Sequence, residues 1–450
     1  MSDLLAIGRS GIVAYRAALS TVGENVSNAE TEGYTRRTVT LKESAVSSSS
    51  NYQYRSSAIF GGVNVGSVNR VFDVYRSSYA RFASSEAERA GAKATWLDVT
   101  EGALDDSDVG LGAKMSAVFT SAEALSADVS SDTNRRTMLS ALNDVANQFR
   151  VTSDALASAA EGVSGSARNA VDQLNANLKT LAQINVGLRR ASPGSAGQAL
   201  LMDQRDKVLQ DLAKTIGVDV KLADDGQASV NLLGNTGTPL IEAGSNEVAL
   251  AGLVESSDGR LSLVASGINA QAIISPQSGL LAGLVDVAST IASRRETLDA
   301  TAQTFADTIN TWNMAGVDRN GDPGAALMTG TTAATLAVAT TDVSKIAAAS
   351  TAGVANGNAL ALRTYRNANG PEAKWEQLVS THANAVSAAK TEQAATASQR
   401  DGALVALDEV TGVDLDVEAA QLLRFQQAYS GSARIVQVAR ETLQEILNLF

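Results

Sequence analysis

Side chains that commonly carry out chemistry are scarce in this sequence of 450 residues. It has no cysteine and one histidine, His382. The absence of cysteine excludes disulfides, thiolate metal sites and cysteine nucleophiles. A single imidazole leaves almost no material for histidine-based metal or acid–base chemistry. His382 lies in a predicted helix among Ala, Ser and Thr, which favours an exposed and inert imidazole.

Two acidic clusters are the remaining candidates for a chemical site. Asp105, Asp106 and Asp108 have no cationic or histidine neighbour in the sequence, so a solvated loop or a helix cap is favoured over catalysis. The DRNGD segment at 318–322 resembles the start of a calcium loop. The twelfth position of such a loop needs an acidic residue, and here it is Thr329. A Gly-Asp turn is the better interpretation, and we predict no catalytic residue, no cofactor and no metal.

The composition limits the class of protein. A net charge of -12 without a basic stripe makes nucleic acid a poor partner. No run approaches about 18 uninterrupted apolar residues, so we expect no membrane insertion. The N-terminal sequence lacks the pattern of a conventional signal peptide, which fits export without a cleavable signal. Few prolines and an aromatic content of 4% favour thin layers of long helices.

Apolar side chains recur in steps of three and four at both ends of the chain. This spacing is a heptad seam, the pattern of helices that pack along a stripe. One seam lies in the first 28 residues, with Gly8 as its weak position, and the other runs from Val413 to Phe450. The residues that we predict to form an assembly interface are Leu5, Ile12, Tyr15, Leu19, Val22, Val26, Leu422, Phe425, Tyr429, Val436, Ala439, Leu443, Ile446 and Phe450.

A seam of this kind needs a partner. Ordering the backbone costs roughly 1–2 kcal/mol per residue. A buried Leu or Ile contributes about 1.5–3 kcal/mol. Because such a residue occurs only every three or four positions, a helix with one seam is stable only when a partner covers the seam. The two seams could pair with each other and leave other faces for neighbouring subunits. Ordinary core helices or a homodimeric coiled coil would show the same spacing.

Between the two ends, the sequence predicts long helices and one β-rich segment. Two short strands are expected at 35–41 and 61–71, and alternating runs separated by DDG, GNTG and SSDG predict hairpins within 217–277. The expected fold is mainly α with a β insert. Its predicted parts are a terminal coiled-coil domain (1–35 and 413–450), a helical bundle domain (36–216 and 278–412) and a β-rich outer domain (217–277).

Four stretches of the sequence resemble one protein family. The segment ENVSNAETEGYTRR, residues 24–37, matches the signature of flagellar axial proteins at Asn25, Asn28, Thr31, Gly33 and Tyr34. The closing AAQLLRFQQAYSGSARIVQVARETLQEILNL resembles the axial-protein C-terminus. SSDTNRRTMLSALNDVANQFR and LLMDQRDKVLQDLAKTIGVDV are more specific and are similar to the FlgK family, hook-associated protein 1.

The match to the family pattern has departures. Glu32 stands where the family usually has proline, Arg37 where glutamine is usual, and Met202 replaces a leucine. These substitutions mark a divergent member and leave the class unchanged. The resemblance is weakest between about 225 and 370.

The resemblance implies a structural role in the bacterial flagellum. Members form a ring between hook and filament and act as a mechanical adaptor. It therefore implies self-association, contacts with hook protein and with the second hook–filament junction protein, and a flagellar export chaperone at the C-terminal helix. It also implies an extracellular location after type III export. No enzyme activity is expected.

Three other functions compete with this interpretation. Another axial protein, a hook or distal rod subunit, shares the terminal motifs, but the Asp-Gln-Arg-Asp segment and the helical stretch 111–215 speak against it. An adhesin or coiled-coil sensor would need a membrane span or a secretion signal, and the sequence pattern predicts neither. A wall hydrolase would need paired carboxylates in a cleft, and the β-rich segment is small and poor in aromatics.

Overall fold

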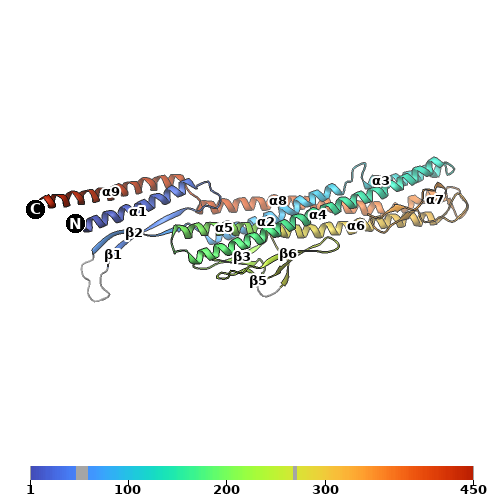
Figure 1. The fold of residues 1–450 in the computed structure, drawn as a ribbon. Helices are drawn as coiled ribbons and strands as arrows, with labels where there is room; N and C mark the ends of the chain where they lie inside the picture. Colours follow the sequence, from blue (N-terminus) through green and yellow to red (C-terminus); the bar gives the residue numbers. More distant parts are fainter. Residues whose placement is uncertain (1, 47–58, 267–270, 449–450) are drawn as a thin grey trace.

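The protein is a long rod whose two terminal helices lie at one end (Figure 1). The structure, a computed structural model, describes residues 2–46, 59–266 and 271–448. At this end, helix α1 (Ser2–Ser27) packs antiparallel to helix α9 (Leu415–Asn448). Strands β1 (Arg37–Val46) and β2 (Ile59–Arg70) form an antiparallel hairpin against α1. The predicted pairing of the two ends is therefore seen within one chain.

Long helices form the rest of the rod, and their bounds agree closely with the sequence patterns. They are α2 (Val74–Ala103), α3 (Leu111–Ala127), α4 (Asp132–Arg190), α5 (Ala196–Thr215), α6 (Leu280–Met314) and α8 (Pro371–Thr411). Short elements gather at the far end: β9 (Gly316–Val317), β10 (Met328–Thr329), β11 (Ala337–Val338), β12 (Ala349–Ser350) and α7 (Gly357–Ala361), with 3-10 turns at Val343–Lys345 and Leu362–Tyr365.

Helix α4 is the longest element, with 59 residues. It begins where the Ser131 side chain accepts a hydrogen bond from the backbone N–H of Asn134, a standard N-cap. The sequence shows a Gly/Ser dip near 162–166, yet the helix continues through it. Gly162 has a packing role, because a Cβ there would lie 2.5 Å from the ring of Trp96 on α2. The glycine thus makes room for an aromatic side chain.

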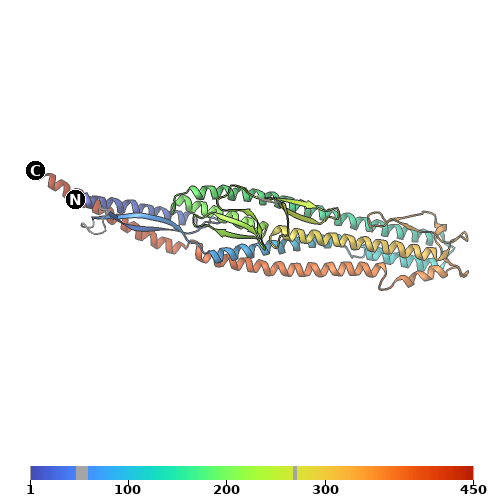
Figure 2. The same cartoon turned by 90° about the horizontal axis from the view of Figure 1, so that it is seen from below.

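Two three-stranded antiparallel sheets lie beside the helices near the middle of the rod (Figure 2). One contains β3 (Val218–Leu222), β4 (Ala228–Leu232) and β5 (Asn235–Ile241), and the other contains β6 (Leu250–Glu255), β7 (Leu261–Ser266) and β8 (Gln271–Ile274). The prediction of a mainly α fold with a β insert is confirmed. The insert has no separate core, because its buried side chains pack against the helices.

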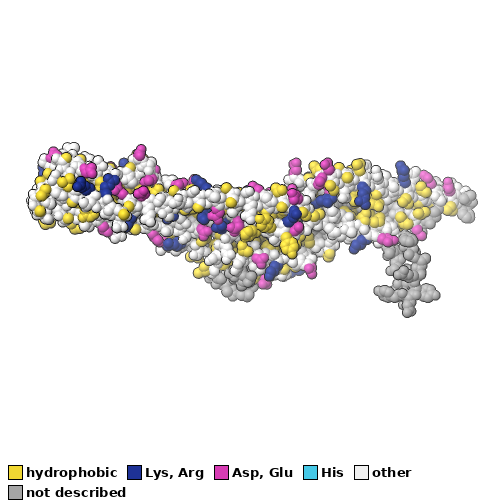
Figure 3. Space-filling view, turned by 180° about the vertical axis from the view of Figure 1, so that it is seen from behind, with side chains coloured by type: hydrophobic (Ala, Val, Ile, Leu, Met, Phe, Trp, Pro, Cys, Tyr) yellow, Lys and Arg dark blue, Asp and Glu magenta, His cyan; other side chains and the backbone are white. Residues whose placement is uncertain are grey.

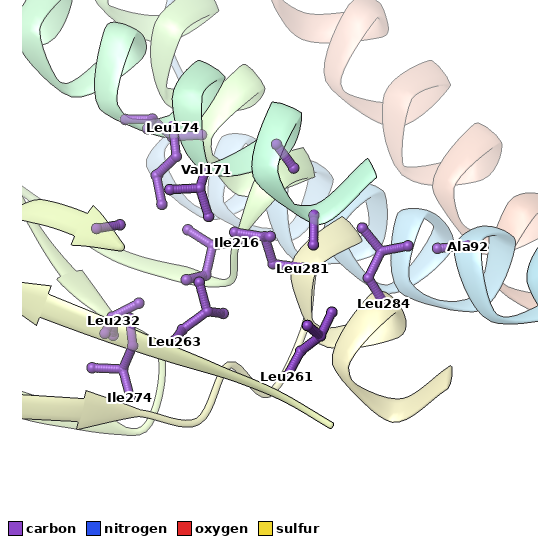
Figure 4. Close-up of a cluster of buried hydrophobic side chains, with 14 of the residues drawn as sticks. Ala92, Val171, Leu174, Ile216, Leu232, Leu261, Leu263, Ile274, Leu281 and Leu284 are labelled. Atoms are coloured by element: carbon purple, nitrogen blue, oxygen red, sulfur yellow. The ribbon is translucent and has the colours of Figure 1, made fainter. Parts of the chain in front are cut away.

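Figure 4 shows this shared core. Leu232, Leu263 and Ile274 project from the strands toward Val171 and Leu174 of α4. A second buried cluster fills the far half of the rod, where the rings of Phe149 on α4 and Phe305 on α6 lie 6.1 Å apart. Helices α4 and α6 contribute to both clusters, so they connect the two halves of the rod.

His382 is buried, and the expectation of an exposed imidazole is wrong. Its side chain is 1% exposed, and Nε2 lies 2.9 Å from the carbonyl oxygen of Leu97. The contact joins α8 to α2, two helices far apart in the sequence. Burial lowers the pKa of His382, so the ring is neutral at pH 7. The residue is part of the packing between these helices.

The surface carries mixed charge. On the face shown in Figure 3, basic and acidic side chains are interspersed along the length of the rod. No helix in the described part of the chain is long and apolar enough to cross a membrane.

Candidate assembly surface and terminal joint

Two glycines of α1, Gly8 and Gly11, lie in close contact with α9. A Cβ on Gly8 would lie 2.6 Å from Cγ2 of Val436, and a Cβ on Gly11 would lie 2.4 Å from Oγ of Ser432. Both glycines are buried. Gly8 is the weak position of the apolar seam, but it is a point of backbone contact, which only a residue without a side chain allows.

The predicted interface residues fall into three groups by exposure. Leu5, Ile12, Tyr15, Leu19, Phe425, Tyr429 and Val436 are half-buried, with the rings of Tyr15 and Phe425 6.5 Å apart. Val22 and Ala439 are buried. Val26, Leu422, Leu443 and Ile446 are exposed. Phe450 lies outside the described residues. The terminal pair thus covers part of each seam and leaves an apolar stripe on α9 facing solvent.

Small residues that the heptad pattern does not mark form much of the contact. Gly11, Ala14 and Ala18 of α1 are buried, as is Ser432 of α9. Helix α1 has two neighbours, the β1–β2 hairpin and α9, so its buried face is broader than a single seam. The run of small residues at 6, 8, 10, 11, 14, 17 and 18 is the sequence signal that points to this close packing.

Asn25 is the centre of a polar cluster at the inner end of the terminal pair. It is 1% exposed, and its Nδ2 donates to the backbone oxygen of Arg37 and to Glu418 Oε2, at 2.9 and 3.0 Å. Its Oδ1 accepts from the hydroxyl of Tyr34 at 2.8 Å and from the backbone N–H of Arg37 at 3.0 Å. Glu418 also accepts from Arg36 Nε at 2.7 Å. One amide therefore connects α1, the following loop and α9.

The other motif residues shape that loop. Asn28 Nδ2 donates to the backbone oxygen of Glu24 at 2.9 Å, and the Thr31 hydroxyl donates to Asn28 Oδ1 at 3.3 Å. Gly33 has a φ of 80°, which a side chain would strain. These three residues turn the chain from α1 toward the hairpin, and Tyr34 and Asn25 hold the turn closed.

The Asp-Gln-Arg-Asp segment of α5 binds the same region from the other side. Asp203 pairs with Arg37 at 2.8 Å and with Arg70 Nε at 3.0 Å. Asp206 pairs with Arg70 at 2.5 Å and with Arg205 at 2.6 Å. From the sequence, local helix ion pairs are expected for Arg205, and its pair with Asp206 is found. The structure also shows that the two aspartates connect the hairpin to the bundle.

We call this cluster the terminal joint, and its members are Asn25, Tyr34, Arg36, Arg37, Arg70, Asp203, Arg205, Asp206 and Glu418.

Burial sets the electrostatics of the terminal joint. It raises the pKa of Tyr34 to about 12, with the neighbouring carboxylates adding to the rise and Arg37 opposing it. Burial also acts to lower the pKa of Arg37, but the hydrogen bond and charge of Asp203 outweigh it, and that pKa is raised. Burial lowers the pKa of Arg205 in spite of the adjacent Asp206. At neutral pH the cluster holds a neutral phenol among paired charges.

The terminal joint has the chemistry of a structural connection. Each of its carboxylates is paired with a guanidinium group, and none of its members is a histidine. No group of three or more His, Cys, Asp or Glu suited to a metal ion occurs in the described ranges. The arrangement fixes the angle between the terminal pair and the bundle. The fold and the terminal joint together place this chain in a class of rod-shaped proteins, in which the paired terminal helices are attached to a helical body.

Comparisons with known proteins identify the family. The helical-domain model of flagellar hook-associated protein FlgK matches residues 97–328, just over half of the chain. The C-terminal model of flagellar basal body rod FlgEFG proteins matches residues 402–449. The chain belongs to the FlgK family.

Curated relatives and a solved structure agree with this assignment. Flagellar hook-associated protein 1 of Escherichia coli is 28% identical over 72% of this chain and 59% of its own length. The Bacillus subtilis protein of the same name is 25% identical over 99% of this chain and 97% of its own length. The hook junction protein FlgK of Burkholderia pseudomallei has the same fold, with a TM-score of 0.68 at 15% identity, covering 74% of this chain and 100% of that chain. The chain matches less than two thirds of the length of the E. coli relative.

Proposed function

We propose that this chain is a structural subunit at the junction between the hook and the filament of the bacterial flagellum. The family assignment across more than half of the chain carries the proposal. The names of the full-length relatives support it. A hook or distal rod subunit is the less favoured alternative, because the matching helical model is that of the hook-associated family. The role is mechanical, and no catalysis is proposed.

The proposed assembly surface is the stripe of apolar side chains on α9 together with the exposed edge of α1. Leu422, Leu443 and Ile446 are 38%, 41% and 43% exposed although they belong to a heptad seam. Large apolar side chains of a seam that stay exposed in the single chain are candidates for contact with another chain. We propose that sister subunits in a ring, hook protein and the second junction protein cover it, and that an export chaperone covers α9 before assembly. The subunit then acts outside the cell.

The predicted domains are proposed to divide this work. The ends, 1–35 and 413–450, assemble. The bundle, 36–216 and 278–412, supports them, and 217–277 lies outermost.

In the free subunit we expect α1 and α9 to be the most mobile helices, because apolar side chains of both, such as Val13 and Leu443, are exposed. Hydrogen exchange of the monomer should show faster exchange there than in α4, and protection as complete as that of α4 would contradict this expectation.

Leu443→Glu tests the assembly surface. The position is exposed, so the thermal unfolding of the purified variant should match that of the wild type. A deletion strain that carries this variant should make hooks without filaments and release filament protein into the medium, as seen by electron microscopy.

Val354→Glu is the matched control, because Val354 is 54% exposed at the far end of the rod. It should restore filaments. Normal filaments with Leu443→Glu incorporated would argue against the surface, and loss of hooks as well as filaments in the deletion strain would favour a rod subunit.

A further inference from the structure

Arg294 of α6 occupies a position where the helix pattern calls for an apolar side chain. The stripe of α6 that faces the bundle interior contains Val287 and Ile291 before it and Leu298 after it, and all three are almost fully buried. Arg294 is half-buried, and its Nε is enclosed without a hydrogen-bond partner in the described part of the chain. A desolvated charge without an anion beside it is costly, so this position favours an anion from outside.

A second cation, Lys374 of α8, accompanies Arg294. Its Nζ donates to the hydroxyl of Thr304 at 2.8 Å, a neutral partner. Within the described residues neither Arg294 nor Lys374 forms an ion pair. Burial lowers the pKa of Arg294, and no neighbouring carboxylate offsets that shift. Both positive charges are therefore available to an anion that approaches the space between α6 and α8.

That space is a groove of about 490 Å³, and both cations line it. Among the described residues its wall contains one carboxylate, that of Glu296, whose Oε1 already accepts from the NH2 group of Arg260 at 3.1 Å. The wall therefore carries two cations against one carboxylate that is paired elsewhere. It also presents two exposed polar side chains of α8, the amide of Gln377 and the hydroxyl of Thr381. This combination of charge and hydrogen-bond donors suits an anion.

We propose that this groove binds a tetrahedral oxyanion of the phosphate type, free or as the end group of a larger molecule, with Arg294 and Lys374 as its charge partners. Two cations match the charge of a dianion, and the guanidinium fork fits the oxygens of a phosphate. Arg294 approaches from α6, and Lys374 and Thr381 approach from α8. The oxygens of a tetrahedral ion can meet donors on both helices at once, whereas a carboxylate offers two oxygens in one plane. The inference is independent of the proposed function.

Inorganic phosphate is the probe, and the isolated full chain is the sample. Isothermal titration calorimetry at neutral pH and constant ionic strength should show saturable binding of phosphate. Binding should be weakened about tenfold or more in Arg294→Gln, because a hydrogen bond between two charged groups is lost. Arg295→Gln is the matched control, because Arg295 is the next residue of α6, is also half-buried and does not line the groove. It changes the net charge equally and should bind phosphate as the wild type does.

A second variant keeps the test valid should Arg294→Gln fail to fold. Lys374 has one neutral partner, Thr304, so Lys374→Gln should fold and should also weaken the binding of phosphate.

Glycerol 1-phosphate, a phosphate monoester, distinguishes the two sources of the ligand. Binding as tight as that of inorganic phosphate indicates a phosphate group carried by a larger molecule, and weaker binding indicates the free ion. Three results would overturn the proposal: no saturable binding to the wild type, unchanged binding in Arg294→Gln or Lys374→Gln, or tighter binding of acetate than of phosphate. Filament assembly is not measured, so failure here is distinct from failure of the proposed function.

Discussion

At the scale of single residues, two side chains hold the terminal joint together. Asn25 joins α1 to α9 through Glu418, and Asp203 joins the hairpin to α5 through Arg37 and Arg70. These contacts connect segments more than 130 residues apart in the sequence. Because their partners are buried, removing one side chain leaves other polar groups without hydrogen bonds, so single substitutions here should have large effects.

Asp203→Asn should lower the free energy of unfolding by about 3 kcal/mol, because it removes the buried carboxylate that Arg37 and Arg70 share, while Arg70 keeps Asp206 and Arg37 keeps the more exposed Glu24. Urea denaturation followed by circular dichroism measures the change. Asp211→Asn on the same helix is the control. Asp211 is half-exposed and pairs with Lys214 at 4.0 Å, a surface pair worth about 1 kcal/mol or less. Equal effects of the two variants would contradict the role of Asp203.

Tyr34 should make stability depend on pH in the alkaline range. Its pKa is about 12 in the folded state, against an ordinary value of 10.0 for a tyrosine in water. The folded state favours the neutral phenol, so the contribution is present below pH about 10 and is lost as the pH rises toward 12. The melting temperature of the wild type should fall more steeply over this range than that of Tyr34→Phe. Parallel curves would show that the phenol is not the titrating group.

The sequence indicates which residues matter in the terminal joint but not what they bind. The Asn-rich turn and the Asp-Gln-Arg-Asp segment stand out as motifs, and both belong to the joint. Their partners come from distant segments, as Asp203 and Arg37 show, and local spacing carries no information about such contacts. His382 is the clearest error for the same reason. Its polar neighbours in the sequence predict exposure, whereas the helix that buries it begins at Val74.

At the scale of elements, the packing of α1 on α9 depends on glycine. Periodicity predicts both helices within a few residues, because an apolar side chain every three or four positions is a strong signal. It does not predict where two backbones touch. Gly8 interrupts the apolar pattern and for that reason lets α9 come close.

Gly8→Ala should lower the melting temperature, although alanine is the better helix former by about 1 kcal/mol. The added Cβ would lie 2.6 Å from Cγ2 and 3.2 Å from the backbone nitrogen of Val436, so the helices must move apart. Gly23→Ala is the matched control in the same helix, because nothing lies within 4 Å of its Cβ position. It should leave the melting temperature unchanged or raise it. A rise in both variants would mean that the two helices do not pack as described.

At the scale of the whole molecule, two buried clusters lie in line along the rod and are connected by α4 and α6. The sequence predicts the β-rich segment by its turns, and its strands are found where expected. Hydrophobic pattern alone does not show whether such a segment encloses its own core. Here the sheets are too thin to do so, and Leu263 and Ile274 complete a core that the helices begin.

Leu263→Ala should therefore destabilise the rod and not the sheet alone. Leu263 is fully buried, and the substitution should cost about 2–5 kcal/mol. Helical circular dichroism and the combined fluorescence of Trp96, Trp312 and Trp375 should show one shifted transition. Ile273→Ala is the control, because Ile273 is 76% exposed in the adjacent strand and should change little. A separate, earlier transition confined to the strands would indicate an independent domain.

The antiparallel arrangement of the two ends also has a consequence in time. Asn25 and Glu418 are separated by 393 residues. A chain that is synthesised from its N-terminus at ~5–20 residues per second reaches the second of them on the order of 20–80 s after the first. During that interval Asn25 and Arg36 have no carboxylate to bind, and α1 has no helix to cover its glycines. Helix α9 locks α1 but is made long after it, so a nascent molecule stays open at this end until α9 has been synthesised.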